Sequence, residues 1–168
     1  DTRGRYGSEG DFWPFTHEVE DGADTLEWLR PQDFCNGQVV MFGASYVGAT
    51  QILAAAGNPD GLVAISPHLT TARHGDSWTY RGGATELAFL LLWIIESLGP
   101  TDLERRLSHM PLAEAERARN TLAKFQRDPQ AAFARLPIVD DDLLALAPYA
   151  ADWFNADHAA VAAADREH

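Results

Sequence analysis

The chain has 168 residues, enough for one domain with a sizeable hydrophobic core and too few for two ordinary domains. Its apolar content of 46% excludes a disordered protein, and its net charge of −12 argues against nucleic acid as a partner, because phosphate binding needs clustered Lys and Arg. The longest apolar run, residues 87–95, is too short to span a bilayer, so no membrane partner is expected.

The single cysteine, Cys35, excludes an internal disulfide framework and leaves the cellular compartment open, with the cytoplasm favoured. It lies beside a turn, with no helix N-terminus or basic neighbour to activate the thiol, so no reactive role is expected. No signal peptide is visible. The chain begins at Asp1 without an initiator methionine, so further residues upstream are an expectation.

The first half of the chain predicts a small α/β unit. Residues 1–15 are glycine-rich without a sustained period, which predicts a loop. Residues 21–30 predict a helix that Asp21 or Asp24 caps and Pro31 ends. The next elements predicted are a strand, a helix and a second strand, each strand apolar enough to be buried on both faces: residues 38–42, 46–56 and 62–66. Together they make one right-handed parallel βαβ unit.

The second half predicts mostly helix. Residues 68–83 are irregular and rich in Thr, Gly and aromatic side chains. Proline residues then mark the joints between five predicted helices: 84–98, 102–109, 112–127, 129–136 and 141–147. The alanine-rich tail from Ala150 predicts a further helix. The expected fold class is therefore α/β with few parallel strands, dominated by helix overall.

A serine stands where the first predicted strand meets the following helix, in the stretch Gly43-Ala44-Ser45-Tyr46-Val47-Gly48. This pattern is close to the Gly-x-Ser-x-Gly nucleophile elbow, in which a strained turn exposes the serine oxygen above the sheet. The second glycine, however, comes three residues after Ser45 and not two. The backbone N–H of Tyr46, at a helix N-terminus, points toward the charge that attack by Ser45 creates. The alternative is a tight turn without a catalytic role.

Residues 43–51 resemble the nucleophile segment of the cocaine-esterase-like hydrolases, a group related to X-prolyl dipeptidyl peptidases and α-amino acid ester hydrolases. In that group the serine is followed by tyrosine and, after one more residue, by glycine, which accounts for the spacing. The likeness extends to other segments of the first half: 1–5, 8–10, 24–29, 35–37 and 62–67. It implies a partial α/β-hydrolase core over residues 1–67, a helical cap over 68–150 and an alanine-rich helical tail over 151–168.

The resemblance also implies roles for individual residues. Ser45 matches the nucleophile, and Tyr46 matches the residue whose backbone N–H forms part of the oxyanion hole. Trp78 and Trp93 match two tryptophans that line the acyl pocket, although the apolar surroundings of Trp93 are equally typical of a helix core. The implied reaction is hydrolysis of a carboxylic ester with an apolar or aromatic acyl group, with no cofactor and no metal. An X-Pro dipeptidyl peptidase or an α-amino ester or β-lactam acylase is the alternative within enzymes.

Three parts of the family's machinery have no counterpart in the sequence. Its triad acid and histidine lie downstream of the cap, and its second oxyanion donor, a tyrosine hydroxyl, lies upstream of Asp1. The chain is therefore expected to be an incomplete segment that lacks the triad Asp and His. A catalytically inactive fragment or a cap-based assembly module is the alternative from another class. Because only two core strands are predicted, self-association through exposed sheet edges is also expected.

Substitutes for the missing groups are few. Asp152 or Asp157 with His158 has the required chain order, but adjacent helical residues such as Asp157 and His158 do not face each other. His68 ends the second predicted strand at the edge where active sites lie, yet a local structural role is favoured. The other histidines have no partner at metal or triad spacing: His17, His74, His109 and His168. Residues 140–142 are three aspartates that predict a helix N-terminus and not a metal site.

Overall fold

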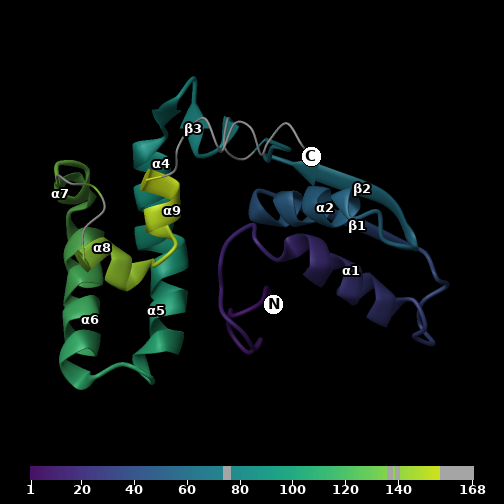
Figure 1. Ribbon diagram of the computed structural model, residues 1–168, viewed down its shortest axis with the longest axis horizontal. Coiled ribbons are helices and arrows are strands. Elements are labelled where there is room, and N and C mark those ends of the chain that lie inside the picture. The colour runs from purple at the N-terminus through teal and green to yellow at the C-terminus, as the bar shows by residue number, and fades with distance from the viewer. Residues whose placement is uncertain (74–76, 136–137, 139–140, 156–168) are drawn as a thin grey trace.

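The computed structural model describes residues 1–73, 77–135, 138 and 141–155. Two parts lie side by side in Figure 1, an α/β part built from the first half and a helical part built from the second, with the N-terminal loop between them. Helix dominates, and one pair of parallel strands is present in the described residues. This agrees with the predicted partial α/β class. The proposed domain boundaries stay a prediction.

The α/β part confirms the predicted βαβ unit. Strand β1 (Val39–Ala44) and strand β2 (Leu62–His68) are parallel, and helix α2 (Tyr46–Ala56) connects them. Helix α1 (Glu18–Leu29) packs on α2, and Gly22 allows the close approach, since a Cβ there would lie 2.5 Å from Cβ of Ala54.

Helix α1 begins earlier than the sequence predicted. Its first residue is Glu18, and no side chain caps it, so the prediction that Asp21 or Asp24 is the cap was wrong. The carboxylate of Asp21 instead accepts a 3.0 Å hydrogen bond from Nε of Arg3, which ties the N-terminal loop to the helix.

The strands are not buried on both faces, contrary to the prediction. Only α2 packs closely against β1 and β2, and the opposite face is bare within the described residues. Val40 and Phe42 on that face are 63% and 79% exposed, and β1 has no strand partner on its outer edge among the described residues. An uncharged, apolar edge strand is prone to pair with another chain.

We expect the chain to self-associate through β1, and Phe42→Lys to shift the population toward monomer because it places a charge on the bare face. Leu112→Lys is the matched control, since Leu112 is 84% exposed in a helix away from the sheet. Size-exclusion chromatography with light scattering measures the change. A monomeric wild-type chain, or an equal effect of both substitutions, would contradict this expectation.

A short hairpin begins inside the segment 68–83, which the sequence predicted to be irregular. Strand β3 (Tyr80–Arg81) pairs antiparallel with β4 (Ala84–Thr85), and helix α4 (Leu87–Leu92) begins only after it. The prediction of a helix from Ala84 was therefore wrong at its start. Gly82 and Gly83 have φ of 58° and 83°, and positive φ at both central residues is what a two-residue hairpin of type I′ requires.

The chain stays helical at Pro100, where the sequence predicted a break between two helices. Residues Trp93–Leu98 form a π-helical turn, η1, that leads directly into α5 (Gly99–Leu107). Pro100 lies in the first turn of α5 and brings no N–H, and the N–H of Gly99 bonds to the carbonyl of Ile94, five residues earlier. A Cβ at Gly99 would lie 2.6 Å from that carbonyl oxygen.

Four further helices follow in the described residues: α6 (Leu112–Arg127), α7 (Pro129–Phe133), α8 (Asp141–Leu146) and α9 (Ala150–Asn155). Helix α6 has the predicted bounds, and α7 is shorter than predicted. The prediction of a helical tail is tested only as far as Asn155, since its later residues lie outside the described part. None of the described helices is long and apolar enough to cross a membrane.

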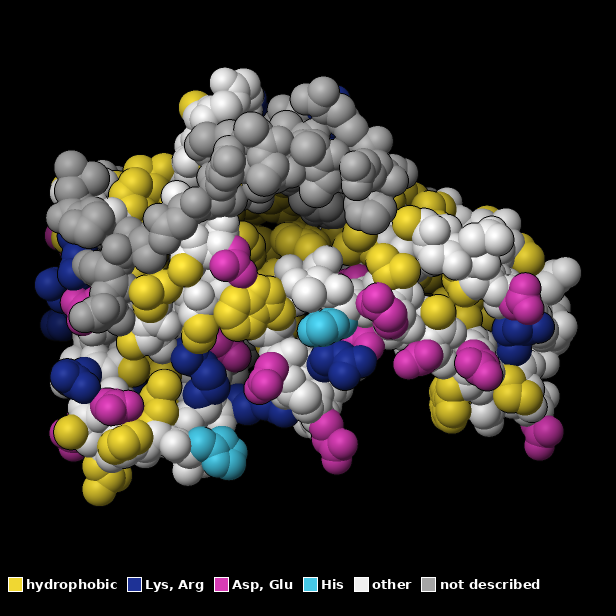
Figure 2. All heavy atoms as spheres, viewed as in Figure 1, with side chains coloured by type: hydrophobic (Ala, Val, Ile, Leu, Met, Phe, Trp, Pro, Cys, Tyr) yellow, Lys and Arg dark blue, Asp and Glu magenta, His cyan; other side chains and the backbone are white. Residues whose placement is uncertain are grey.

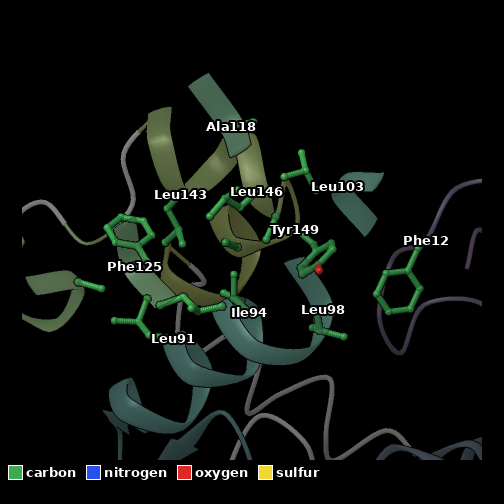
Figure 3. Packing of buried hydrophobic residues seen from close by; sticks show 14 of the residues in the cluster. Phe12, Leu91, Ile94, Leu98, Leu103, Ala118, Phe125, Leu143, Leu146 and Tyr149 are labelled. Atoms are coloured by element: carbon green, nitrogen blue, oxygen red, sulfur yellow. The ribbon is translucent and has the colours of Figure 1, made fainter. Parts of the chain in front are cut away.

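The main hydrophobic core lies among these helices, where Ile94, Leu146 and Tyr149 are buried almost completely (Figure 3). Phe12 joins the core from the N-terminal loop, with its ring 5.6 Å from that of Tyr149 in an edge-on contact. Arg5 places its guanidinium 4.6 Å from the Phe12 ring centre. The loop therefore connects the helical part to the α/β part.

Tyr149 makes the folding free energy depend on pH. Its side chain is 1% exposed, its hydroxyl has no hydrogen-bond partner in the described part, and burial, followed by the charge of Asp102, raises its pKa. A raised folded-state pKa gives stability that is present below about pH 10 and lost as pH rises, because the unfolded chain ionises first. Tyr149→Phe should therefore reduce the fall in the urea midpoint between about pH 9 and pH 11. An unchanged fall would contradict this.

Candidate active site

Ser45 lies at a strained turn between β1 and α2. Its backbone has φ 58° and ψ −127°, a conformation that costs a non-glycine residue about 1–3 kcal/mol. Although it occupies the N-cap position, its side chain makes no capping hydrogen bond, and in the described part its Oγ has no hydrogen-bond partner. The Ser45 N–H donates to the carbonyl of His68 at 3.0 Å. The side chain is thus exposed at the carboxyl edge of the sheet.

Gly43 and Gly48 occupy positions where a side chain would not fit. A Cβ at Gly43, whose φ is 149°, would lie 2.7 Å from Cγ1 of Val47. A Cβ at Gly48 would lie 2.8 Å from Cγ2 of Thr70 and 3.2 Å from the carbonyl oxygen of Gly43. The second close approach occurs three residues after Ser45. This explains the glycine spacing of the sequence in physical terms.

Gln51 stabilises the turn through hydrogen bonds from the interior of the α/β part. Its side chain is fully buried and donates to the carbonyl of Val47 at 2.9 Å and that of Gly43 at 3.3 Å. Its Oε1 accepts the N–H of Ser66 in β2 at 3.1 Å. Sequence reasoning missed this role, although a polar residue in an otherwise apolar helix was the available signal.

Tyr46 begins α2, so its backbone N–H has no partner inside the helix and lies at the positive end of the helix dipole. Its phenol is engaged elsewhere: the hydroxyl donates to Oε1 of Glu18 and accepts the N–H of Phe15 at 3.2 Å. The hydroxyl is thus engaged, whereas the amide lies at the open N-terminus of α2.

Ser45 lines a cavity of about 420 Å³ together with Trp78 and Phe89. Arg81 and Glu86 line the same cavity and form an ion pair, with 2.8 Å between Nε and Oε1. The structure therefore brings Ser45 and Trp78 to one cavity, and their roles as nucleophile and pocket wall stay predictions. Phe89 was not predicted, since nothing in its apolar run separates it from a core residue.

Trp93 does not line this cavity. It lies at the centre of an aromatic cluster, with its ring 6.0 Å from Trp78, 5.7 Å from Phe89 and 5.5 Å from Trp153, the last two in stacked contact. Trp93 thus packs against both aromatic residues of the cavity wall. The space-filling view shows hydrophobic side chains gathered in the hollow between the two parts of the molecule (Figure 2).

A larger cavity, about 810 Å³, lies between the N-terminal loop and α1. It does not include Ser45, and the described residues that line it contain no histidine. One of its acidic groups, Asp21, is paired with Arg3. The strained serine and the aromatic wall both belong to the smaller cavity, which is therefore the candidate active site.

No described histidine contacts the hydroxyl of Ser45. His68 faces Ala44 in the strand register and offers Ser45 only its backbone carbonyl. Asp152 accepts the indole N–H of Trp13 at 2.9 Å, so its carboxylate is already engaged. Several other candidates of the sequence analysis lie outside the described residues: His74, Asp140, Asp157, His158 and His168. Among the residues that are described, no three His, Cys, Asp or Glu side chains meet as metal ligands.

With this geometry established, comparison with known proteins shows the family. The model of the X-Pro dipeptidyl-peptidase (S15) family matches residues 1–166. The chain belongs to this family. The family implies the α/β-hydrolase fold, of which β1, α2 and β2 supply the part around the serine turn.

A cocaine esterase from Rhodococcus sp. (strain MB1 Bresler) is 44% identical over 94 residues. The aligned region covers 55% of this chain and 16% of the esterase. The chain thus spans only a small part of the length of this relative.

Proposed function

We propose that this chain carries the nucleophile segment of a serine acyl hydrolase that cleaves carboxylic esters through an acyl-enzyme on Ser45. The observation that carries the proposal is the positive-φ turn, which leaves the serine hydroxyl uncapped, exposed and beside the first free amide of α2. A serine that served only as a helix cap would bond its hydroxyl to that helix. Here the strain is maintained without such a bond.

In the proposed reaction, Oγ of Ser45 attacks the ester carbonyl and its proton passes to a base. The carbonyl oxygen becomes an oxyanion that the N–H of Tyr46 stabilises. Loss of the alcohol leaves an ester on Ser45, and water then releases the carboxylic acid. No described histidine is placed to act as the base, so the triad acid and histidine are proposed to come from outside the described residues.

The cavity wall supports an apolar or aromatic acyl group as the substrate part beside Ser45. Trp78 and Phe89 offer rigid apolar surface. Trp93 stacks on Phe89 and contacts Trp78 at a tilt, and Trp153 stacks on Trp93. The esterase relative favours an ester, and the family description favours an X-Pro peptide as the second candidate.

The proposal is tested with p-nitrophenyl butyrate and an Xaa-Pro p-nitroanilide, each followed before and after the first turnover. We expect a burst of about one equivalent of p-nitrophenol and then slow release. Acylation is helped by the oxyanion donor and by p-nitrophenolate, which leaves without being protonated, whereas hydrolysis of the alkyl ester on Ser45 needs a positioned base for the attacking water. The anilide should give no burst. Faster cleavage of the anilide would favour the peptidase, and a folded chain without any burst would favour the inactive fragment.

A further inference from the structure

The side chain of Tyr46 is held by a buried carboxylate from another element. Its hydroxyl donates to Oε1 of Glu18, the first residue of α1, 28 positions earlier in the chain. The N–H of Phe15 donates to the same hydroxyl at 3.2 Å, and the Phe15 ring stacks on the Tyr46 ring at 4.8 Å. The residue directly after Ser45 is therefore fixed by the N-terminal loop and by α1 together.

Burial of the Glu18 carboxylate is unfavourable by itself, and its hydrogen bonds offset this cost. The residue is 6% exposed, and a buried carboxylate without partners is strongly unfavourable. Its second oxygen accepts the N–H of His17 at 3.1 Å. The pKa of the Tyr46 phenol is raised, first by burial and then by the charge of Glu18 and the hydrogen bond to it. The phenol consequently stays protonated and remains a donor throughout the neutral range.

We propose that Glu18 is a positioning residue for the oxyanion-binding amide, acting through the phenol of Tyr46. The inference rests on the proposed function for its catalytic consequence. Ser45 fixes one side of the 45–46 peptide group through its strained backbone, and the anchored side chain of Tyr46 fixes the other. Both constraints are needed, because the first turn of a helix has no internal bond at its N–H groups.

The distance dependence of catalysis gives the expected size of the effect. A misplacement of about 1 Å at a reacting group lowers the rate by about 100-fold. Loss of the Glu18 contact leaves the amide in place but less well fixed, so we expect the acylation rate to fall by about 10- to 100-fold. Binding of the ester before reaction should change little, since neither Glu18 nor the Tyr46 phenol lines the cavity of Ser45.

The first test is spectroscopic and needs no catalytic activity. ¹⁵N relaxation dispersion on the full chain compares the amides of residues 45–47 in the wild type, Glu18→Leu, Glu18→Gln and Tyr46→Phe. We expect exchange broadening in the leucine and phenylalanine variants and near wild-type behaviour in Glu18→Gln, which keeps an acceptor. Tyr149→Phe, which alters a buried tyrosine of the helical core, should leave these amides unchanged. Wild-type amides in a folded Tyr46→Phe chain would overturn the inference.

The second test measures the burst rate with p-nitrophenyl butyrate as a function of ester concentration. The proposed positioning role predicts a lower maximal rate at an unchanged half-saturating concentration, with recovery in Glu18→Gln. Equal burst rates in the wild type and Tyr46→Phe would overturn it. Absence of a burst in the wild type would instead contradict the proposed function, and the relaxation measurement would then still decide whether Glu18 orders the amide. Should Glu18→Leu fail to fold, Tyr46→Phe decides both tests, because it removes only the hydroxyl.

Discussion

Ser45→Ala is expected to remove the p-nitrophenol burst completely and to lower the acylation rate by at least about 1000-fold, because no other group occupies the strained turn. The fold should be unaffected, since Oγ of Ser45 has no hydrogen-bond partner in the described part and the residue is exposed. The free energy of unfolding should change by less than about 0.5 kcal/mol. Stopped-flow absorbance and urea titration measure the two quantities.

Ser77→Ala is the matched control for this substitution. Ser77 lines the same cavity, but its hydroxyl donates to the carbonyl of Arg73 at 2.9 Å and contacts the hydroxyl of Thr71. Its removal should leave the burst at the wild-type amplitude. A burst that persists in the Ser45 variant, or disappears in the Ser77 variant, would place the nucleophile elsewhere.

Gly4→Ala is expected to destabilise the chain by about 3 kcal/mol or more, because a side chain at a positive φ and a clash with backbone atoms each cost about 1–3 kcal/mol. Gly4 has φ 70°, and a Cβ there would lie 2.1 Å from the backbone nitrogen of Phe12. The loop could not close on itself, and Phe12 would leave its contact with Tyr149. Because the same loop carries Phe15, the support of Tyr46 should fail as well.

Gly7→Ala in the same loop separates crowding from a general intolerance of substitution. Among the described residues, none beyond the two chain neighbours of Gly7 has a heavy atom within 4 Å of a Cβ at this position. The φ of Gly7 is not in the left-handed region, so the change should cost less than about 0.5 kcal/mol. Urea unfolding compares the two variants with the wild type. Equal midpoints for Gly4→Ala and the wild type would show that the loop does not support the fold.

The sequence predicted those features that local chemistry determines. The apolar runs of β1 and β2, the Gly-Ala-Ser turn and the helix that follows each depend on neighbouring residues, and the structure confirms all of them. The hairpin of residues 80–85 was also local, but its two glycines were taken as a sign of irregular structure. The missed signal was the Gly82-Gly83 pair, since two residues with positive φ form a tight hairpin turn.

The remaining features depend on contacts between residues far apart in the chain. Glu18 and Tyr46 are 28 residues apart in the chain. Phe12 precedes α1, whereas Tyr149, whose ring it contacts, lies between α8 and α9. The hydrophobic pattern around Trp93 and Phe89 does not distinguish a residue that lines the cavity from one that packs behind its wall. The exposure of β1 could not be predicted either, because an apolar strand has the same sequence pattern whether or not another element covers it.

Covalent labelling shows whether Ser45 is the nucleophile. The folded chain is treated with a fluorophosphonate, digested, and its peptides are fragmented by mass spectrometry to locate the adduct. We expect one adduct per chain, on Ser45, and none on Ser66, which lies in the neighbouring strand. An adduct on another residue, or no adduct on a chain that is shown to be folded, would contradict it.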